Sequence, residues 1–526
     1  METSSSVARR SARPRSGPHN LALLAEGALE RRGDHPALEF EGAWHRSAAL
    51  HERSARLAGG LIELGVGRGD RVLVIARNCP EVLLGYHAAW RAGAVVVPAI
   101  FMLSAREIAH VLDDSGARVA LVEPSLLGKL RAAAARAGSA VRLVVLGEDD
   151  SGGALPLAEL ADAAAAAIVP RADDDLAALL YTGGTTGRAK GVMLSHANLW
   201  HAGRGRAEMG YVEGFDRTVI ALPLSHAFGV MVTVSELHWP SRRQVSLLPW
   251  FDAATWLVRG EELRVTDATM VPAMLQVLLA HPLEQYDLGS LRSIVCGSAP
   301  LPAQVHEALR RRWPGVELRE GYGLTESAAL VSGTPPGAVR PGSVGVAMPG
   351  VEVEIRDPSG AAVAAGEPGE LCTRSPSTMR GYWNDPEATA EALRDGWLHT
   401  GDVARRDEDG YLYIVDRKKD LIIRGGFNVY PRDVEEALLA HPDLVEAAVV
   451  GRPDEERGEE VVAFVVARAG AEPRTEELVA WAREQIGGYK YPRQIRVTEA
   501  LPRTSIGKVD RRRLRELAAV DARSRS

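Results

Sequence analysis

A glycine- and threonine-rich stretch, YTGGTTGRAKG at residues 181–191, decides how this chain folds. It follows an apolar run, residues 176–180, which predicts a buried strand. Glycines let backbone N–H groups come close to an anion, and successive N–H groups form a nest for phosphate oxygens. Threonine hydroxyls add donors, and Lys190 adds a positive charge. The stretch therefore predicts a strand that leads into a phosphate-binding loop, with a second strand over 191–196.

This loop differs from the common Walker nucleotide-binding loop, in which a lysine directly follows the last glycine and a helix comes next. Here Lys190 lies three residues after Gly187, and a strand is expected after it. A hairpin turn without a ligand is the alternative interpretation, but such turns rarely carry three hydroxyl groups.

Length, charge and cysteine content exclude several classes of protein. A chain of 526 residues is too long for one hydrophobic core, so we expect at least two domains. The net charge of −7 argues against a nucleic-acid partner. Three widely spaced cysteines offer neither a disulfide framework nor a metal-binding spacing, which favours a reducing compartment. Residues 1–18 resemble a disordered leader rather than a secretory signal, and the longest apolar stretch, 92–103, is too short to cross a bilayer. We therefore expect a cytoplasmic protein without an integral membrane segment.

Helix and strand patterns alternate along most of the chain, which predicts an α/β fold with parallel sheets covered by helices. The expected helices are 21–32, 81–92 and 108–113, and the expected strands are 71–75, 94–98 and 119–122. The alanine-rich tracts 132–136 and 163–167 are either helix or linker.

A dense charge cluster at 416–420 marks an expected hinge between domains 19–415 and 416–526. Beyond it, a small α+β pattern predicts helices over 434–440 and 476–485 and strands over 447–450 and 461–466.

Five further segments carry polar residues that could take part in chemistry, although each alone is a weak signal. They are PLSHAFG at 223–229, CGSAP at 296–300, EGYGLTE at 320–326, TGD at 400–402 and PRTSIGK at 502–508. Taken singly, His226 is more often a core histidine, Glu326 a solvated carboxylate and Lys508 a surface lysine.

Together, in this order and spacing, the six segments resemble the superfamily of adenylate-forming enzymes. Its members include acyl- and aryl-CoA synthetases, luciferases and the adenylation domains of peptide synthetases. The resemblance covers residues 20–515 and is closest to fatty-acyl-CoA synthetases, through DRKKDLIIRGGFNVYP at 416–431. It implies a large N-terminal domain of βα-layered sheets and a small, mobile α+β C-terminal domain. The loop departs from the usual pattern at Gly183, where serine is common, and at Ala189, where proline is common.

The resemblance also implies an activity. An ATP-dependent, AMP-forming ligase converts a carboxylic acid, here a medium- or long-chain fatty acid, into an acyl-adenylate and transfers the acyl group to the thiol of CoA. ATP, Mg²⁺, CoA and a small-molecule acid are the expected partners, and a homodimer is left open. The alternatives are a ligase that loads an acyl carrier protein, a luciferase-like oxygenase and a non-catalytic nucleotide-binding regulator. Retention of Lys190, Glu326, Asp402, Arg417 and Lys508 counts against the regulator.

Residue roles carry over from the family's motifs by position. The phosphate-binding set is Thr182, Gly183, Gly184, Thr185, Thr186, Gly187 and Lys190. The set that encloses adenine is Gly297, Ser298, Ala299, Glu320, Gly321, Tyr322 and Gly323, with Tyr322 stacking on the base.

The resemblance assigns the remaining polar residues to ribose, metal and the reacting groups. Glu326 and Thr186 hold Mg²⁺, Thr325 contacts the α-phosphate, and Asp402 accepts both ribose hydroxyls. Arg417 supports the ribose or α-phosphate, Lys508 bridges the substrate carboxylate and α-phosphate, and His226 lines the junction of the acyl and thiol sites. The catalytic set is thus Lys508, Thr325, Glu326, His226 and Lys190. Lys419 is the hinge residue, and Gly425 and Gly426 allow close passage of the CoA pantetheine arm.

The expected acyl pocket is apolar. It comprises Val230, Met231, Val232, Val271, Met274, Ala328, Ala329, Leu330 and Val331. Ala227 stands where amino-acid-activating relatives carry an aspartate, which argues against an α-amino acid. We consider two interpretations of His238 and Trp239: a wall of the acyl tunnel, or a variant surface loop.

Overall fold

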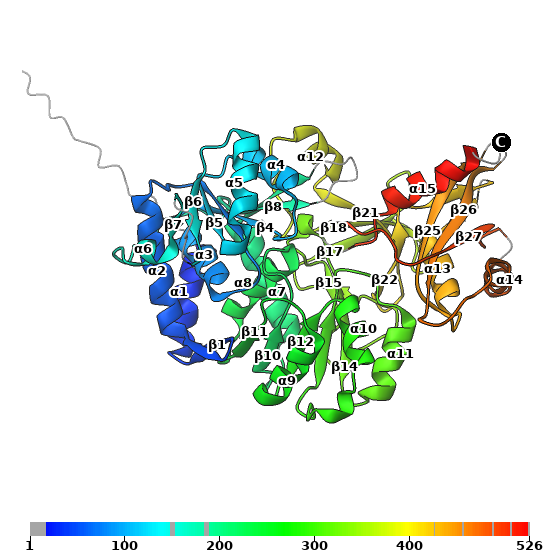
Figure 1. Ribbon diagram of the computed structural model, residues 1–526, viewed down its shortest axis with the longest axis horizontal. Helices are drawn as coiled ribbons and strands as arrows, with labels where there is room; N and C mark the ends of the chain where they lie inside the picture. The colour runs from blue at the N-terminus through cyan, green and yellow to red at the C-terminus, as the bar shows by residue number, and fades with distance from the viewer. Residues whose placement is uncertain are drawn as a thin grey trace, which may run out of the picture.

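Two large β-sheets and the helices between them form most of the molecule, as the ribbon of the computed structural model shows (Figure 1). The structure describes residues 17–147, 153–182, 189–425, 427–454, 457–486, 489–504 and 508–523.

The first sheet has eight strands in the order β19-β9-β8-β4-β3-β5-β6-β7. It is parallel from β8 to β7, and β9 and β19 are antiparallel additions at one edge. The strands are β3 Arg71–Ile75, β4 Val95–Ala99, β5 Val119–Val122, β6 Arg142–Val145, β7 Leu155–Pro156, β8 Leu176–Thr182, β9 Lys190–Ser195 and β19 Gly381–Tyr382.

The second sheet has nine strands in the order β16-β15-β14-β13-β12-β10-β11-β1-β2. Strands β14 to β1 in this order run parallel. The strands are β1 Pro36–Phe40, β2 Ala43–Arg46, β10 Arg217–Ile220, β11 Gln244–Leu247, β12 Asp267–Met270, β13 Ser293–Cys296, β14 Glu317–Tyr322, β15 Ser332–Gly333 and β16 Val346–Ala347.

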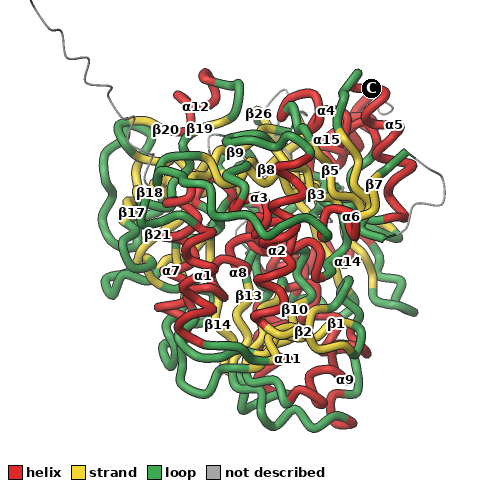
Figure 2. Tube along the Cα trace, turned by 90° about the vertical axis from the view of Figure 1, so that its left-hand side faces the viewer, coloured by secondary structure: helices red, strands yellow, loops and turns green. Residues whose placement is uncertain are grey.

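Helices cover these sheets and fill the space between them (Figure 2). They are α1 Leu21–Arg32, α2 Ser47–Glu63, α3 Pro80–Arg91, α4 Ala105–Ser115, α5 Leu127–Ala137, α6 Leu157–Ala161, α7 His196–Gly210, α8 Ala227–His238, α9 Ala253–Leu263, α10 Pro272–Ala280, α11 Ala303–Arg312 and α12 Pro386–Ala392. Short 3₁₀ turns lie at η1 Pro124–Leu126, η2 Leu283–Gln285 and η3 Thr325–Ser327.

One hydrophobic core joins the two sheets through α3, α7 and α8. Alternate residues of β3 show how the layers form: Val72 and Val74 belong to this shared core, whereas Leu73 and Ile75 belong to the core under α4 and α5. The indole of Trp90 in α3 is fully buried, and its N–H donates to the Ala177 carbonyl of β8. Because the strands of each sheet are mostly parallel, their carboxyl ends gather at one edge, where such folds place their sites.

A third sheet of five strands connects to the C-terminal part. The C-terminal part is drawn in orange and red in Figure 1. Its strands are β17 Glu352–Arg356, β18 Gly369–Arg374, β20 Leu393–Arg394, β21 Trp397–Arg406 and β22 Leu412–Arg417. The fourth sheet has the strands β23 Ile422–Arg424, β24 Phe427–Val429, β25 Leu444–Asp454, β26 Gly458–Ala467 and β27 Gln494–Thr498. Helices α13 Pro431–Leu439 and α14 Thr475–Gln485 pack on one face of this sheet, and α15 Arg511–Arg523 packs on the other.

The α/β fold class predicted from the sequence is confirmed, with a large N-terminal part and a smaller C-terminal part. The helix 21–32 and the strands 71–75 and 119–122 have the expected bounds. The expected strand 191–196 ends one residue earlier, because the Ser195 side chain accepts from the Asn198 N–H and starts α7. The tract 163–167 is not helical, since α6 ends at Ala161. A domain boundary between residues 415 and 416 stays a prediction; the chain crosses from the third sheet to the fourth in segment 418–421. Among the described helices, none combines the length and apolar character needed to cross a membrane.

Candidate active site

The segments predicted to enclose adenine lie side by side at the carboxyl ends of β13 and β14. The two strands pair in parallel, with Cys296 opposite Glu320. Ser298, just beyond β13, has a left-handed backbone with φ 72°. A Cβ at Gly297 would stand 3.0 Å from the Gly321 carbonyl oxygen, so the chain passes closer here than most side chains permit.

Asp402 is the best-anchored carboxylate of the site. It lies on β21 and is almost fully buried. The Arg417 Nε of β22 pairs with its Oδ1 at 2.9 Å, and the Tyr322 hydroxyl donates to its Oδ2. Burial, followed by the Asp402 charge, raises the pKa of Tyr322 well above its ordinary value, so the phenol keeps its proton. Each carboxylate oxygen has two lone pairs, so Asp402 can still accept further hydroxyl donors.

Glu326 lies in η3, directly after a tight crossing of the chain. A Cβ at Gly323 would stand 2.3 Å from the Ala329 carbonyl atoms, so only glycine fits there. The Tyr382 hydroxyl donates to the Glu326 Oε1 at 2.8 Å. Sequence reasoning missed Tyr382, because it lies 56 residues from Glu326 and in none of the motifs used.

Lys190 and Thr182 face each other across the β8–β9 hairpin that begins and ends the phosphate loop. The Lys190 ammonium lies 3.8 Å from the Asp385 carboxylate and 5.1 Å from the centre of the Tyr382 ring. Asp385 is a further residue that sequence reasoning missed. The loop residues Gly183, Gly184, Thr185, Thr186 and Gly187 lie outside the described residues.

Lys508 belongs to the C-terminal part but interacts electrostatically with groups of the N-terminal part. Desolvation, followed by repulsion from Arg417, lowers the pKa of Lys508, whereas Asp402 and Glu326 oppose this shift. The side chain keeps contact with solvent. The Lys508 charge is thus within electrostatic range of the predicted ribose and metal ligands.

His226 precedes α8 and caps that helix through its ring. Its Nδ1 accepts from the Phe228 N–H at 3.3 Å. Burial, followed by the nearby charge of Lys508, lowers the pKa of His226 to about 4, so the ring is neutral at physiological pH. Because Nδ1 is the acceptor, the proton of the neutral ring belongs on Nε2, and His226 can donate a hydrogen bond from that atom.

The segment between the third and fourth sheets is tied to both sides. The Lys418 N–H donates to the Gly401 carbonyl at 2.9 Å, on the side of the large domain. Asp420 is bonded to Arg515 of α15, and Arg511 of the same helix lies 3.7 Å away. Burial, followed by repulsion from Arg417, lowers the pKa of Lys419 between these two anchor points. Gly425 takes a left-handed φ of 58°, and Gly426 lies outside the described residues.

The acyl-pocket candidates fall into two groups. Val230, Met231 and Val232 of α8 and Val331 are at most 1% exposed and are packed in the cores. Met274, Ala328 and Leu330 are also buried, whereas Val271 and Ala329 are half-buried. The candidates therefore divide into core residues and two that keep some contact with solvent.

The surface-loop interpretation is wrong for Trp239, and the tunnel-wall interpretation stays a prediction. Trp239 follows the far end of α8, about 20 Å from His226 along the helix axis. It is 3% exposed and therefore not part of a surface loop. Its ring packs on Tyr211, and the Arg243 guanidinium lies 4.2 Å from its centre. The residue packs at the carboxyl end of α8, away from His226.

Two family models match the chain: the AMP-binding enzyme model over residues 25–383 and the AMP-binding enzyme C-terminal domain model over 433–508. The chain is 41% identical to a feruloyl-CoA synthase of Amycolatopsis sp over 88% of this chain and 91% of the relative. It is 34% identical to a long-chain-fatty-acid–CoA ligase of Bacillus subtilis (strain 168), over 96% of each chain. The crystal structure of ATP-bound MatB from Rhodopseudomonas palustris superposes with a TM-score of 0.86 and 34% identity, over 94% of this chain and 98% of that one.

Proposed function

Because the chain belongs to the AMP-binding enzyme family, we propose that it joins a carboxylic acid to CoA at the expense of ATP, with AMP as a product. The observation that carries this proposal is the buried Asp402 carboxylate, held by Arg417 and Tyr322, with the Lys508 charge in electrostatic range of it and of Glu326. A nucleotide, a metal-bound phosphate and a substrate carboxylate need such a mixture of charges.

In the first half-reaction, a carboxylate oxygen attacks the α-phosphorus of ATP, and the bond to pyrophosphate breaks. Acyl-adenylate and pyrophosphate are the products. Two anions must approach each other, so positive charge near them should dominate catalysis. Lys508 and Lys190 supply that charge in our proposal, and Asp402 holds the ribose hydroxyls. The Glu326 carboxylate is a hard oxygen ligand that suits Mg²⁺, which would offset phosphate charge. Tyr382 orients that carboxylate.

In the second half-reaction, the CoA thiol releases its proton to solvent, its sulfur attacks the acyl carbonyl carbon, and AMP leaves with the electrons of the broken C–O bond. His226 is neutral and offers an N–H at Nε2, so we assign it the role of a donor to the carbonyl oxygen rather than that of a base. A rotation of the C-terminal part about Lys419 would remove Lys508 before this step.

The acid is apolar and uncharged beyond its carboxylate, since Ala227 and the residues around it offer no partner for an amine. The sequence favoured a medium- or long-chain fatty acid. Two observations favour an aromatic acid as the second candidate. Val230, Met231 and Val232 of α8 are at most 1% exposed and packed in the core, which favours a short acyl pocket, and a feruloyl-CoA synthase is 41% identical to this chain.

Mass spectrometry of reactions with ATP, Mg²⁺ and CoA tests the proposal. Ferulate, decanoate and leucine compete in one mixture, and an acyl carrier protein replaces CoA in a parallel one. Thioester of ferulate or decanoate with CoA, and none with leucine, is the expected result. Formation of acyl-adenylate without CoA thioester would refute CoA as the acceptor. AMP formation with leucine and with neither of the other acids would refute an apolar acid as the substrate.

A further inference from the structure

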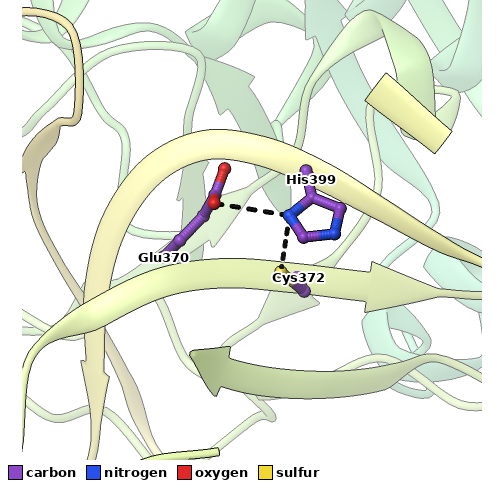
Figure 3. A group of neighbouring side chains, drawn as sticks. All are labelled: Glu370, Cys372 and His399. Atoms are coloured by element: carbon purple, nitrogen blue, oxygen red, sulfur yellow. Dashed lines mark hydrogen bonds and ion pairs between the residues drawn. The ribbon is translucent and has the colours of Figure 1, made fainter. Parts of the chain in front are cut away.

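Three potential metal ligands of different kinds meet beside the ribose-binding strand (Figure 3). Glu370 and Cys372 belong to β18, and because they are two residues apart they point to the same face of the strand. His399 of the neighbouring β21 lies directly opposite Cys372. From these positions we propose that Glu370, Cys372 and His399 form a binding site for a divalent transition metal ion such as Zn²⁺.

The distances between the ligand atoms fit a single ion. The His399 Nδ1 lies 3.3 Å from the Cys372 Sγ and 3.3 Å from the Glu370 Oε2. All three atoms lie within 4.8 Å of one another. Zinc bonds of about 2.3 Å to sulfur and 2.0–2.1 Å to nitrogen place neighbouring tetrahedral ligands about 3.4–3.6 Å apart. Only small side-chain rotations are therefore needed to enclose an ion.

The arrangement of the three residues suits a metal-binding site better than a catalytic site with Cys372 as the nucleophile. In a relay of thiol, imidazole and carboxylate, the thiol and the carboxylate contact opposite ring nitrogens. Here both contact the same nitrogen, Nδ1, as Figure 3 shows. On metal binding, the thiol releases one proton and the imidazole keeps its proton on Nε2.

Lys418 is the group that a metal ion must compete with. Its ammonium lies 3.1 Å from the Glu370 Oε2, and Arg394 lies 4.0 Å from the same oxygen. The Glu370 and His399 side chains are each 12% exposed, whereas the Lys418 side chain is 56% exposed. Lys418 can therefore move into solvent when a cation takes its place. This lysine also begins the segment between the two parts of the chain, so the site lies directly beside the proposed hinge.

Titration of the full-length protein with Co²⁺, in the absence of Mg²⁺ and ATP, tests the site through its spectrum. We expect a saturable sulfur-to-cobalt charge-transfer band in the near ultraviolet and intense d–d bands of a four-coordinate ion. Cys372→Ser should abolish the charge-transfer band. Glu370→Gln and His399→Gln should weaken binding by more than about tenfold, the loss usual even for residues that only orient ligands. Lys418→Met should tighten binding about two- to fivefold, because an exposed competing ion pair is lost.

Cys79→Ser is the matched control, since Cys79 is a half-buried thiol at the start of α3. It should leave the spectrum unchanged. Thermal unfolding without cobalt shows whether each variant folds, and Zn²⁺ should raise the melting temperature of the unsubstituted protein but not that of Cys372→Ser. An absent charge-transfer band in the unsubstituted protein, or a band that survives in Cys372→Ser, would overturn the proposal.

Discussion

Removal of the Lys508 ammonium is expected to separate the two half-reactions. In the structure this charge interacts with Asp402 and Glu326, the proposed ribose and metal ligands. It should therefore stabilise the meeting of the substrate carboxylate with the α-phosphate. Lys508→Ala loses this charge but little packing, because the side chain keeps contact with solvent.

Loss of a charge-assisted contact made mainly in the transition state costs about 3–4 kcal/mol, or a hundred- to a thousandfold in rate. The pH dependence adds a second signature. Because the pKa of Lys508 is lowered, the charged form disappears at a lower alkaline pH than for an ordinary lysine. The adenylation rate of the unsubstituted enzyme should thus decline at alkaline pH. The residual adenylation rate of Lys508→Ala should not show this decline.

Pyrophosphate release reports the first half-reaction, and thioester formation from synthetic acyl-adenylate reports the second. We expect only the first to fall. Lys490→Ala is a suitable control, because that lysine of the same domain pairs with Asp433 at 2.7 Å and has no assigned role in the reaction. Equal loss in both half-reactions would refute the separation and, with it, the proposed rotation.

Arg424→Met should destabilise the C-terminal part by about 1–3 kcal/mol in urea denaturation, because the buried Glu460 carboxylate loses two charge-assisted bonds of 2.6 and 3.0 Å and keeps only the more exposed Arg457 as an ionic partner. No change in the urea midpoint would contradict this. Burial raises the pKa of Glu320 to about 7, above its ordinary 4.5, so the folded state holds an extra proton and the free energy of unfolding should fall as pH rises between these values. Glu320→Gln should abolish this pH dependence when urea denaturation is repeated across the same pH range. An unchanged dependence of the unfolding free energy on pH would mean that another group causes it. Tyr382→Phe should slow adenylation by about tenfold or more, since the Glu326 carboxylate loses a hydrogen bond, and added Mg²⁺ should restore part of the rate. A loss of adenylation rate that added Mg²⁺ does not restore would argue that Tyr382 does not act through Glu326.

Local patterns in the sequence were sufficient for the elements of the fold. The strand 71–75 and the helix 21–32 have the expected ends because hydrophobic periodicity and capping residues act over a few neighbours. The tract 163–167, expected as either helix or linker, is not helical, because the chain there packs its backbone against α2, with a Gly59 Cβ position only 2.1 Å from the Ala164 carbonyl oxygen.

Contacts between distant segments account for what the sequence could not predict. Tyr322 was expected to stack on adenine and Asp402 to bind ribose, but the bond between them, across 80 residues, has no sequence signal. The same holds for Tyr382 and Glu326. The burial of Trp239 also depends on distant contacts, with Tyr211 and Arg243, which a local pattern does not reveal. The roles of the site residues stay predictions until variants are measured.

Asp420 has a mechanical consequence for the proposed rotation. Its bonds to α15 make the chain from Asp420 onward part of the moving body, while the main-chain bond from Lys418 to Gly401 fixes the other side. The rotation would then twist the backbone of 418–420 and would break the bonds from the Asp420 and Leu421 N–H groups to the Arg417 carbonyl. A hinge of so few residues would permit rotation of the C-terminal part about one axis and would restrict its other motions relative to the N-terminal part. The C-terminal part would then alternate between two defined orientations, and α15 would move with it as one rigid unit.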